Sequence, residues 1–319
     1  MNAVAAAKLN DANRDPLAGM MAQAGVVNGW HKDEPSLWPL PKKEFQPAHW
    51  SYAQTGAVLD AAGAVVSTEL AERRNLILAN PLPGNRYPTV KTLVSAYQMV
   101  KPGETARSHR HSANALRLVL DAQPGMFTIV EGRRIPMLPG DVLLTPNWHW
   151  HGHSNESSVN GYWLDFLDVP LVHLLGPMFF EHHPDGIERE APVDEASPMR
   201  FSWNSIRERL AAAPETVPGR REIELGSPAL PSISLKVLRL APRSLCRQGP
   251  VTANALFAVM EGEGACDVEE RAFVFARGDV IAVPAACRMT CRTTAETILL
   301  RVSDEPVFRD LGWLRAIAA

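Results

Sequence analysis

The sequence predicts a mainly β protein whose β domain occurs twice behind an N-terminal helical extension. Short apolar runs separated by Gly, Pro and Asp turns begin near residue 92 and continue towards the C-terminus. The segment Ser-Ala-Asn-Ala-Leu at 112–116 recurs as Thr-Ala-Asn-Ala-Leu at 252–256, and the turn at 139–142 recurs at 277–280. Self-similarity at this scale indicates a duplicated domain and not a solenoid of short repeats. A chain of 319 residues is long enough for two domains of ordinary size.

The first region, residues 1–90, is predicted to be helical and extended. Asp15 and Pro16 begin a short helix over 17–24, because Asp caps helices and Pro fits the first turn. The proline-rich segment 33–49 is expected to wrap over the body of the protein or over a neighbouring subunit. Two helices and a strand that Asn80-Pro81 ends are predicted next, over 52–62, 67–74 and 76–79 respectively.

The first β domain is predicted over residues 91–180, and its first strand covers 92–100. Val94, Ala96 and Gln98 share one face of that strand, because successive side chains alternate sides. This face of small and polar residues either leaves room for a ligand or is the polar side of a half-buried strand. Further strands are predicted over 116–120, 127–130, 142–145 and 161–166, with a hairpin turn at 131–134.

Five of the ten histidines lie between residues 103 and 155. His109 and His111 are separated by one residue, so a strand places both imidazoles on one face. After the turn at 139–141, His151 can return on a neighbouring strand and complete a metal site. Three neutral imidazoles suit iron, manganese, nickel, copper or zinc and leave coordination positions open for substrate. The pattern therefore predicts a catalytic metal site.

The second half of the chain is predicted to contain a linker and a metal-free copy of the first β domain. Residues 181–232 are rich in proline and charge, with one helix over 205–213 capped by Asn204. The copy occupies residues 233–319. The positions of His109, His111 and His151 correspond in it to Gly249, Val251 and Met289. None of these can replace an imidazole, so we expect the copy to pack the domains, and the subunits, together.

Composition excludes several classes of function. The 32 basic and 35 acidic residues nearly balance, and no basic run indicates a nucleic acid or membrane partner. No apolar run reaches the ~18 residues of a membrane span. The four cysteines lack zinc-type spacing, and we interpret them as buried, reduced thiols of a soluble cytoplasmic protein.

The histidine spacing resembles the two-part cupin signature. Gly103 precedes His109 by six positions and His111 by eight, as in the first part. Gly140, Pro146, His151 and Asn155 match the second part, with Trp148 where a glycine is usual. The resemblance implies a bicupin, that is, two double-stranded β-helix (jelly-roll) barrels. The metal-binding Glu common in cupins is absent, because its positions hold Ala115 and Leu116.

A bicupin with one three-histidine site resembles the gentisate and salicylate 1,2-dioxygenases. The matching residues are Glu72-Arg73-Arg74, Asn80-Pro81, Gln98, Arg117, Trp148 to His153 and Trp163-Leu164-Asp165. The resemblance implies an Fe(II)-dependent, extradiol-type dioxygenase of aromatic catabolism that uses a small aromatic acid and O2. Both oxygen atoms would enter between the carboxyl-bearing and hydroxyl-bearing carbons of gentisate or of a 5-substituted salicylate, such as nitro or chloro. It also implies a homo-oligomer, by resemblance a tetramer.

Two other classes of function stay open on the sequence. Metal-dependent isomerases and decarboxylases of the cupin superfamily share this kind of site, although they usually retain the missing Glu. A non-catalytic cupin that binds a small molecule is the second alternative. Oxygen uptake on addition of an aromatic acid distinguishes these classes from a dioxygenase.

Roles for individual residues follow from the motif frame and from the resemblance. The Gly140 and Asn155 frame selects His151 as the third metal ligand, with His149 as a bystander. His153 is expected to take the phenolic proton of the substrate, or to act as a hydrogen-bonding group near the metal. His31, His49, His173, His182 and His183 are expected to be structural or surface residues.

Arg117 has the same strand parity as His109 and His111, so its guanidinium should point into the site and bind the substrate carboxylate. The alternative for Arg117 is a surface position. The resemblance alone implies substrate-binding roles for Arg73, Gln98 and Asp165. Relatives often have a tryptophan at the position of Val94, and the smaller side chain here predicts a larger 5-substituent on the substrate.

Overall fold

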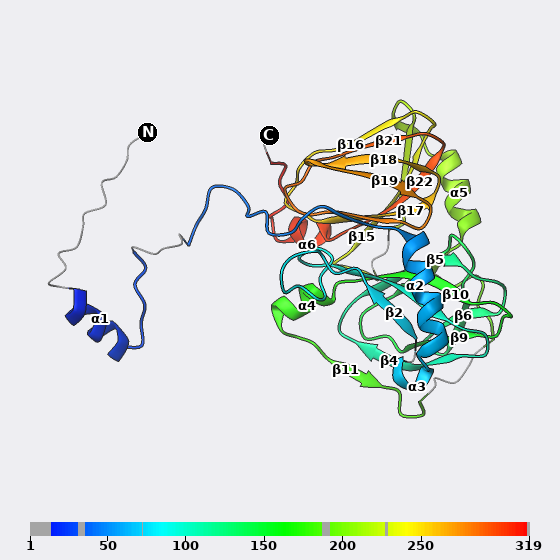
Figure 1. The fold of residues 1–319 in the computed structure, drawn as a ribbon, viewed down its shortest axis with the longest axis horizontal. Helices are drawn as coiled ribbons and strands as arrows, with labels where there is room; N and C mark the ends of the chain where they lie inside the picture. The colour runs from blue at the N-terminus through cyan, green and yellow to red at the C-terminus, as the bar shows by residue number, and fades with distance from the viewer. Residues whose placement is uncertain (1–13, 31–35, 72, 187–191, 227–228, 318–319) are drawn as a thin grey trace. The chain divides into compact units, whose positions relative to one another are not determined.

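The computed structural model describes residues 14–30, 36–71, 73–186, 192–226 and 229–317 (Figure 1). The chain divides into two compact units, residues 1–42 and 43–319. The first unit contains helix α1 (Arg14–Gln23), which confirms the helix predicted over 17–24. His31, the start of the proline-rich segment and Glu72 lie outside the described residues. No helix in the described part of the chain is long and apolar enough to cross a membrane.

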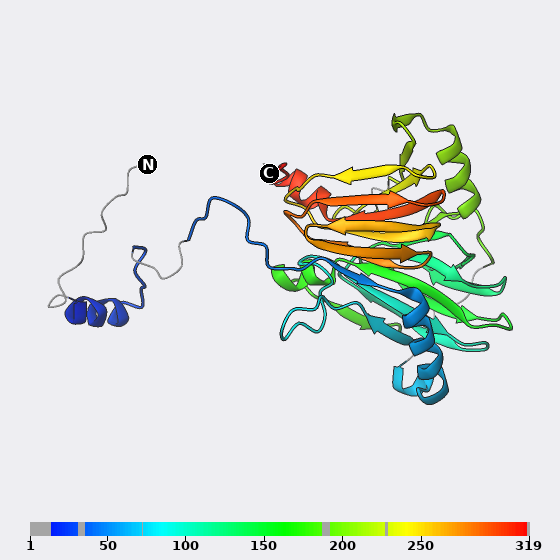
Figure 2. The same cartoon turned by 45° about the horizontal axis from the view of Figure 1, so that its top comes forward.

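The second unit contains four antiparallel sheets, which form two lobes (Figures 1 and 2). The first lobe has a six-stranded sheet, ordered β12-β8-β5-β10-β3-β2, and a five-stranded sheet, ordered β11-β4-β9-β6-β7. Its strands are β2 (Arg74–Ile77), β3 (Val94–Val100), β4 (Thr105–His111), β5 (Ala115–Asp121), β6 (Met126–Val130), β7 (Arg133–Pro136), β8 (Val142–Thr145), β9 (His151–Asn155), β10 (Gly161–Leu167), β11 (Phe180–His182) and β12 (Arg200–Phe201).

The second lobe repeats this arrangement. It has a seven-stranded sheet, ordered β1-β20-β17-β22-β15-β14-β13, and a four-stranded sheet, ordered β16-β21-β18-β19. Its strands are β1 (Ala48–Trp50), β13 (Glu215–Val217), β14 (Arg220–Glu224), β15 (Ser234–Leu240), β16 (Leu245–Gln248), β17 (Ala255–Glu261), β18 (Glu263–Val268), β19 (Arg271–Ala276), β20 (Val280–Val283), β21 (Met289–Thr293) and β22 (Thr297–Ser303). The two lobes confirm the predicted mainly β, bicupin fold class.

Five helices accompany the sheets of the second unit: α2 (Tyr52–Val65), α3 (Thr68–Ala71), α4 (Val169–Leu175), α5 (Trp203–Ala212) and α6 (Glu305–Asp310). Helices α4 and α6 follow the equivalent strands β10 and β22, so each lobe ends in the same way. All four cysteines, Cys246, Cys266, Cys287 and Cys291, are buried free thiols in the second lobe, as the sequence predicts.

The duplication extends to unusual backbone conformations. Trp148 and Ala286, at equivalent positions of the two lobes, adopt left-handed φ values of 62° and 64°. The Trp148 N–H donates to the carbonyl of His111, and the Ala286 N–H donates to the carbonyl of Val251. A left-handed conformation costs a non-glycine residue roughly 1–2 kcal/mol. Because both lobes keep it, this strained turn belongs to the fold and not to the metal chemistry of one lobe.

The main hydrophobic core lies between the two large sheets. Each large sheet contributes the apolar face of its central strands, which include Tyr97, Met99, Leu116, Leu118 and Phe166 in the first lobe and Leu235, Val237, Leu256, Leu300 and Val302 in the second. A smaller core fills each lobe on the other side of its large sheet. Side chains that alternate with the main core therefore point into the interior of a lobe.

The segment that precedes each lobe pairs with the other lobe. Strand β1 pairs with β20 of the second lobe, and strand β12 pairs with β8 of the first. The residues that follow are held in the same way. The Tyr52 N–H donates to Asp279 at 2.8 Å, and the Trp203 N–H donates to Asp141 at 2.8 Å. Each lobe thus completes its large sheet with a strand from the segment that leads into the other.

Some predicted elements need correction. The helix predicted over 67–74 ends at Ala71, and β2 begins at Arg74, because that segment pairs with β3. Helix α5 begins at Trp203 and is capped by the Ser202 hydroxyl, not by Asn204. Strand β2 lies before residue 90, and β13 and β14 lie before residue 233, yet all three belong to the large sheets. The predicted domain boundaries therefore remain a proposal.

Candidate metal centre

A β-bulge in β4 prepares the candidate metal centre. Strands β4 and β9 pair with Ala106 opposite His153 and with His109 opposite His151, so β4 has one residue more than β9 in between. Gly152 faces this bulge. A Cβ at Gly152 would lie 2.8 Å from the Ser108 Oγ, closer than side chains pack. Bulges redirect side chains at such sites, and this one requires glycine on the opposite strand.

The side chains of His109, His111 and His151 converge at the small sheet of the first lobe. Their ligand atoms lie within 4.8 Å of one another. In each imidazole, Nδ1 lies 2.9–3.2 Å from a backbone carbonyl. A carbonyl can only accept a hydrogen bond, so Nδ1 carries the proton and the Nε2 lone pair is free. This arrangement orients imidazoles as metal ligands are oriented.

The buried setting keeps these imidazoles neutral. Burial and the nearby Arg73 lower the pKa of His109 from 6.5 to about 3, and burial lowers that of His111 to about 4. Burial also places the pKa of His151 well below 6.5. The buried Nε2 of His151 has no hydrogen-bond partner in the described structure. Three neutral imidazoles with free Nε2 atoms fit a divalent metal of the first transition row.

The other two histidines of the motif occupy different environments. His149 is half-buried, its Nδ1–H donates to the Asn147 carbonyl at 3.0 Å, and it is not part of the three-histidine group. His153 is fully buried, and its ring lies 4.9 Å from that of Trp163. Neither ring nitrogen of His153 has a hydrogen-bond partner among the described residues. Burial, followed by Arg117, lowers the pKa of His153 well below 6.5, so this imidazole is neutral.

A buried polar network lies in the same lobe. Arg73 donates to the Gln98 side-chain oxygen, and Gln98 donates in turn to Asp165. The Nε of Arg117 lies 3.3 Å from the Asp165 carboxylate, and another of its nitrogens donates to the Thr145 hydroxyl. Arg117 and Asp165 are both 1% exposed, so the surface position considered for Arg117 is excluded. Burial raises the pKa of Asp165, and Arg117 opposes this shift.

Val94, Ala96 and Gln98 lie on the face of β3 that points away from the main core, as their alternation predicts. Val94 is buried in a small apolar cluster with Ala113 and Val169. The carbonyl of Ala113 accepts the hydrogen bond from His111, so Val94 packs beside a residue that orients a candidate metal ligand. Its position makes it a candidate wall of the site.

Sequence reasoning gave no role to three residues of this region, although Gly152 and Trp163 lie within the matching motifs. Thr145 accepts from Arg117, Gly152 accommodates the bulge, and Trp163 donates from its indole to Asp165 at 2.9 Å. Gly152 could have been noticed, because a glycine inside a predicted strand often marks a close backbone approach. The pairing of Thr145 with Arg117 depends on the register of two strands, for which the sequence holds no local signal, whereas Trp163 and Asp165 are two residues apart on one strand.

The histidines expected to be structural or on the surface take several positions. His49 lies 2.8 Å from Asp279, next to the strand exchange. The His173 ring contacts that of Tyr87, and His183 contacts Trp150. His182 is exposed, and its backbone pairs with His109. None of the four belongs to the three-histidine group.

The second lobe differs at the equivalent place. Its strands β16 and β21 pair without a bulge, so Gln248 lies opposite Met289 as His109 lies opposite His151. The sequence offset aligned Gly249 with His109. The strand register instead aligns Gln248 with His109, one residue earlier than Gly249, because β4 has the bulge and β16 does not.

Comparisons with known proteins agree with this geometry. Residues 96–167 match the cupin domain family. The chain is 32% identical to a gentisate 1,2-dioxygenase from Streptomyces sp over 94% of both chains. It is also 32% identical to a 5-aminosalicylate 1,2-dioxygenase from Comamonas sp, over 94% of this chain and 89% of that protein. A 1-hydroxy-2-naphthoate 1,2-dioxygenase from Nocardioides sp. (strain KP7) is 30% identical over 86% of this chain and 79% of its own.

Solved structures show the same relationship. A salicylate 1,2-dioxygenase from Pseudoaminobacter salicylatoxidans, in a structure with gentisate, superposes with a TM-score of 0.89 at 25% identity. The match covers 98% of this chain and 96% of that chain. These relatives are ring-cleaving dioxygenases, and not cupin isomerases, decarboxylases or non-catalytic binding proteins.

Proposed function

Because this chain belongs to the gentisate and salicylate 1,2-dioxygenase family of ring-cleaving dioxygenases, we propose that it opens a 2-hydroxybenzoate with Fe(II) held by His109, His111 and His151. The observation that carries this proposal is the convergence of three Nε2 atoms whose Nδ1–H groups are held by backbone carbonyls. Both atoms of O2 enter between the carboxyl-bearing and hydroxyl-bearing carbons of the ring.

Ferrous iron in this site would supply open coordination positions for the substrate oxygens and for O2, and would couple the ring electronically to O2. The donor set supports a metal that accepts three neutral nitrogens. Within the described part of the chain, no carboxylate joins this group of ligands. An anionic substrate is therefore favoured, because its own charge balances that of the metal.

We propose that the polar network binds the substrate carboxylate. Arg73 and Arg117 both lower the pKa values of the neighbouring histidines, so two guanidinium charges reach the site. Asp165 is the carboxylate that offsets them within the network. Arg117 binds the substrate carboxylate through its guanidinium. Asp165 and Thr145 hold Arg117 in place, while Gln98 links Asp165 to Arg73.

We propose that His153 receives the phenolic proton when the substrate binds. Its imidazole is neutral and both nitrogens are free of hydrogen bonds in the described structure, which supports a proton acceptor. Its ring packs on Trp163, and this contact holds the orientation of the imidazole. The alternative role for His153 is to orient the substrate by a hydrogen bond without taking the proton.

We propose that the substrate is gentisate or a salicylate with a 5-substituent such as nitro or chloro. Val94 has a small side chain beside the loop that orients His111, and this supports space for a substituent. The names of the relatives cover rings with different substituents, from gentisate and 5-aminosalicylate to 1-hydroxy-2-naphthoate. The shared feature of these acids is a hydroxyl ortho to the carboxylate.

The test is anaerobic loading of the full chain with Fe(II), followed by an oxygen-uptake screen of gentisate and 5-substituted salicylates. We expect one O2 to be consumed per ring opened, and 18O2 to place both labelled atoms in the product. Parallel loading with Mn(II) and Zn(II) tests the choice of metal. Release of CO2 without oxygen uptake would instead indicate a decarboxylase, and one labelled atom would indicate a hydroxylase.

We also propose that the enzyme is a cytoplasmic homo-oligomer, by resemblance a tetramer. The four buried free thiols support a reducing compartment. Light scattering of the purified protein measures the number of subunits, and a monomer at assay concentration would contradict this proposal.

A further inference from the structure

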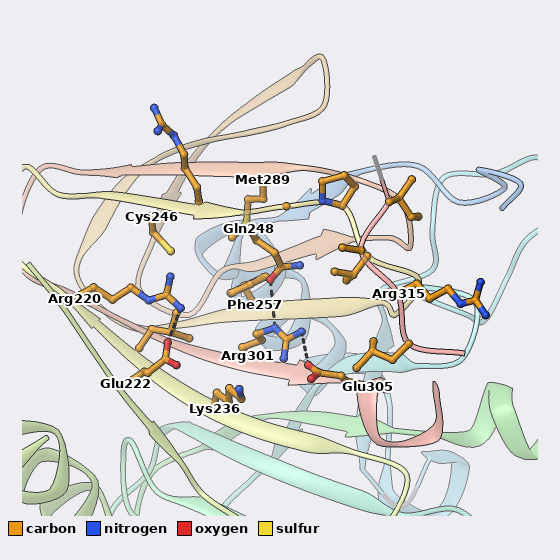
Figure 3. Close-up of a pocket in the computed structure, with 18 residues that line it drawn as sticks. Arg220, Glu222, Lys236, Cys246, Gln248, Phe257, Met289, Arg301, Glu305 and Arg315 are labelled. Carbon is orange, nitrogen blue, oxygen red and sulfur yellow. Dashed lines mark hydrogen bonds and ion pairs between the residues drawn. The ribbon is translucent and has the colours of Figure 1, made fainter. Parts of the chain in front are cut away.

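The second lobe contains a cavity of about 560 Å³ at the place that corresponds to the metal centre of the first lobe (Figure 3). Gln248, Val251 and Met289, the counterparts of His109, His111 and His151, line it. A volume of this size suits a small organic ligand. Where the first lobe has its three imidazoles, the second lobe therefore has a cavity and not a packed interior.

A lysine points into this cavity. Lys236 and Leu238 line it, whereas Val237, between them, belongs to the core between the lobes. Strand β15 is paired on both sides, with β14 and β22, so Lys236 does not reach solvent over a sheet edge. The equivalent position in the first lobe is Ala96, because Ala96 lies opposite Asp165 as Lys236 lies opposite Arg301. Lys236 is half-buried, so its ammonium is partly removed from water and an anion beside it would be stabilising.

Two of the other cations of the lining are paired, whereas Arg247 and Arg315 are exposed and have no ion pair within 4 Å among the described residues. Arg220 lies 2.5 Å from Glu222, and Arg301 lies 3.1 Å from Glu305 (Figure 3). Glu305 accepts a second ion pair from Arg309 at 2.8 Å. Among the described residues, Lys236 has neither a hydrogen bond nor an ion pair within 4 Å. The lining therefore has five cations, Lys236 among them, against the two carboxylates of Glu222 and Glu305.

Apart from Arg247, Gln248 and Arg315, the remaining lining is apolar. Phe257 is the counterpart of Arg117. Phe257 lies opposite Arg301 of β22, and Arg117 lies opposite Asp165 of β10, which is the equivalent residue of the first lobe. Phe257 and Met289 are buried and form part of the wall (Figure 3). An aromatic ring and a thioether offer a surface for a flat or aliphatic hydrocarbon.

The C-terminal segment borders the cavity. Ala316 pairs with Val251, and the Ile317 N–H donates to the Pro250 carbonyl at 2.9 Å. In the first lobe, Phe180 pairs with His111 at the corresponding place. In both lobes a segment therefore pairs at this edge, so the edge of the cavity belongs to the duplicated fold.

We propose that this cavity is a second, non-catalytic binding site for a small carboxylate with an apolar body, such as an aromatic acid. The carboxylate of the ligand forms an ion pair with Lys236, next to Arg301, and the apolar body of the ligand packs on Phe257 and Met289. The proposal goes beyond the ring-cleaving activity, since it needs neither the metal nor the histidines of the first lobe.

Benzoate is the probe that tests this site, because it has the carboxylate and the ring but no phenolic oxygen to chelate a metal. It is titrated calorimetrically, without O2, into the full metal-loaded chain and into its variants. We expect a benzoate-binding component that persists in His151→Ala and weakens at least tenfold in Lys236→Met. The matched control is Arg239→Gln, which removes a cation from the same strand outside the cavity lining. This control should bind benzoate as the wild type does.

A second variant, Val251→Trp, places an indole in the cavity without removing a charge, and it should also abolish this component. If either Lys236→Met or Val251→Trp unfolds, the other still decides the question. Binding that is lost in His151→Ala but unchanged in both cavity variants would overturn the proposal, and so would the absence of any binding to His151→Ala. An inactive dioxygenase that still shows the component would contradict the proposed function alone.

Discussion

The two lobes share the order of their strands, their left-handed turns and their terminal helices, but they differ inside. In the first lobe, a bulge opposite Gly152 brings three imidazoles together above an Arg117–Asp165 pair. In the second, the same strands run without a bulge, and Phe257 and Arg301 occupy the positions of that pair. The comparison shows that the cupin backbone does not by itself create a metal centre. The position of one bulge and a few interior side chains make the difference.

The largest expected effect follows from removing a metal ligand. His151→Ala should abolish metal binding and turnover while the protein stays folded, because the buried imidazole leaves only a small space beside polar neighbours. His149→Ala is the matched control and should keep both. Metal analysis of the wild type should give one ion per chain, since the second lobe lacks the three histidines. Two ions per chain, or a fully loaded His151→Ala, would refute the assignment.

A second prediction makes the first lobe resemble the second. Thr290 is the second-lobe counterpart of Gly152, so Gly152→Thr introduces the side chain that the unbulged strand carries. Its Cβ would lie 2.8 Å from Ser108 Oγ and 3.0 Å from the Ala106 carbonyl. We expect metal affinity to fall about 10–100-fold, as when groups that orient ligands are lost. The reverse change, Thr290→Gly, should leave metal affinity unchanged. Unaltered metal affinity in Gly152→Thr would mean that the bulge is not needed.

The buried ion pair provides a third test. Arg117→Met leaves the Asp165 carboxylate buried without its cation, which should cost roughly 3–5 kcal/mol of unfolding free energy in a urea titration. The double variant Arg117→Met, Asp165→Asn should regain most of that stability, because both charges are then gone and the amide oxygen still accepts from Trp163. It should not regain kcat/KM, since the substrate carboxylate still lacks its partner. A double variant as active as the wild type would rule out the proposed role of Arg117.

The smallest expected effect concerns the wall of the site. Val94→Trp should shift preference from 5-nitrosalicylate or 5-chlorosalicylate towards gentisate, because the indole would fill space beside Ala113 and Val169. A few methylene groups of fit correspond to a change of roughly tenfold in the ratio of kcat/KM values. Val274→Trp, at an exposed position of the second lobe, is the control and should not alter the ratio. An unchanged ratio in Val94→Trp would remove Val94 from the pocket.

The features that the sequence predicted are those with a local or periodic signal. The spacing of His109 and His111, the repeated Gly-Asp turns and the alternation on β3 are all read within a few residues. The bulge was not predicted, because an extra residue in one strand changes how the two strands pair but leaves no signal in the composition. The contact of Thr145 with Arg117, that of Trp163 with His153, and the direction of Lys236 depend on strands that meet only after the chain has folded. The proposed roles of Arg73, Gln98 and Asp165 rest on family resemblance together with their observed contacts.

The exchange of strands between the lobes has a consequence for the order of events during synthesis. Strand β1 leaves the ribosome early, but its partner β20 follows only about 230 residues later. At roughly 5–20 residues per second, that interval is about 10–50 s. Strand β12 is synthesised soon after β8, so the large sheet of the first lobe can be completed while β1 still lacks its partner strand. A released fragment that ends at residue 212 should therefore protect β8 from proteases but leave Ala48–Trp50 open to chaperones and to wrong partners.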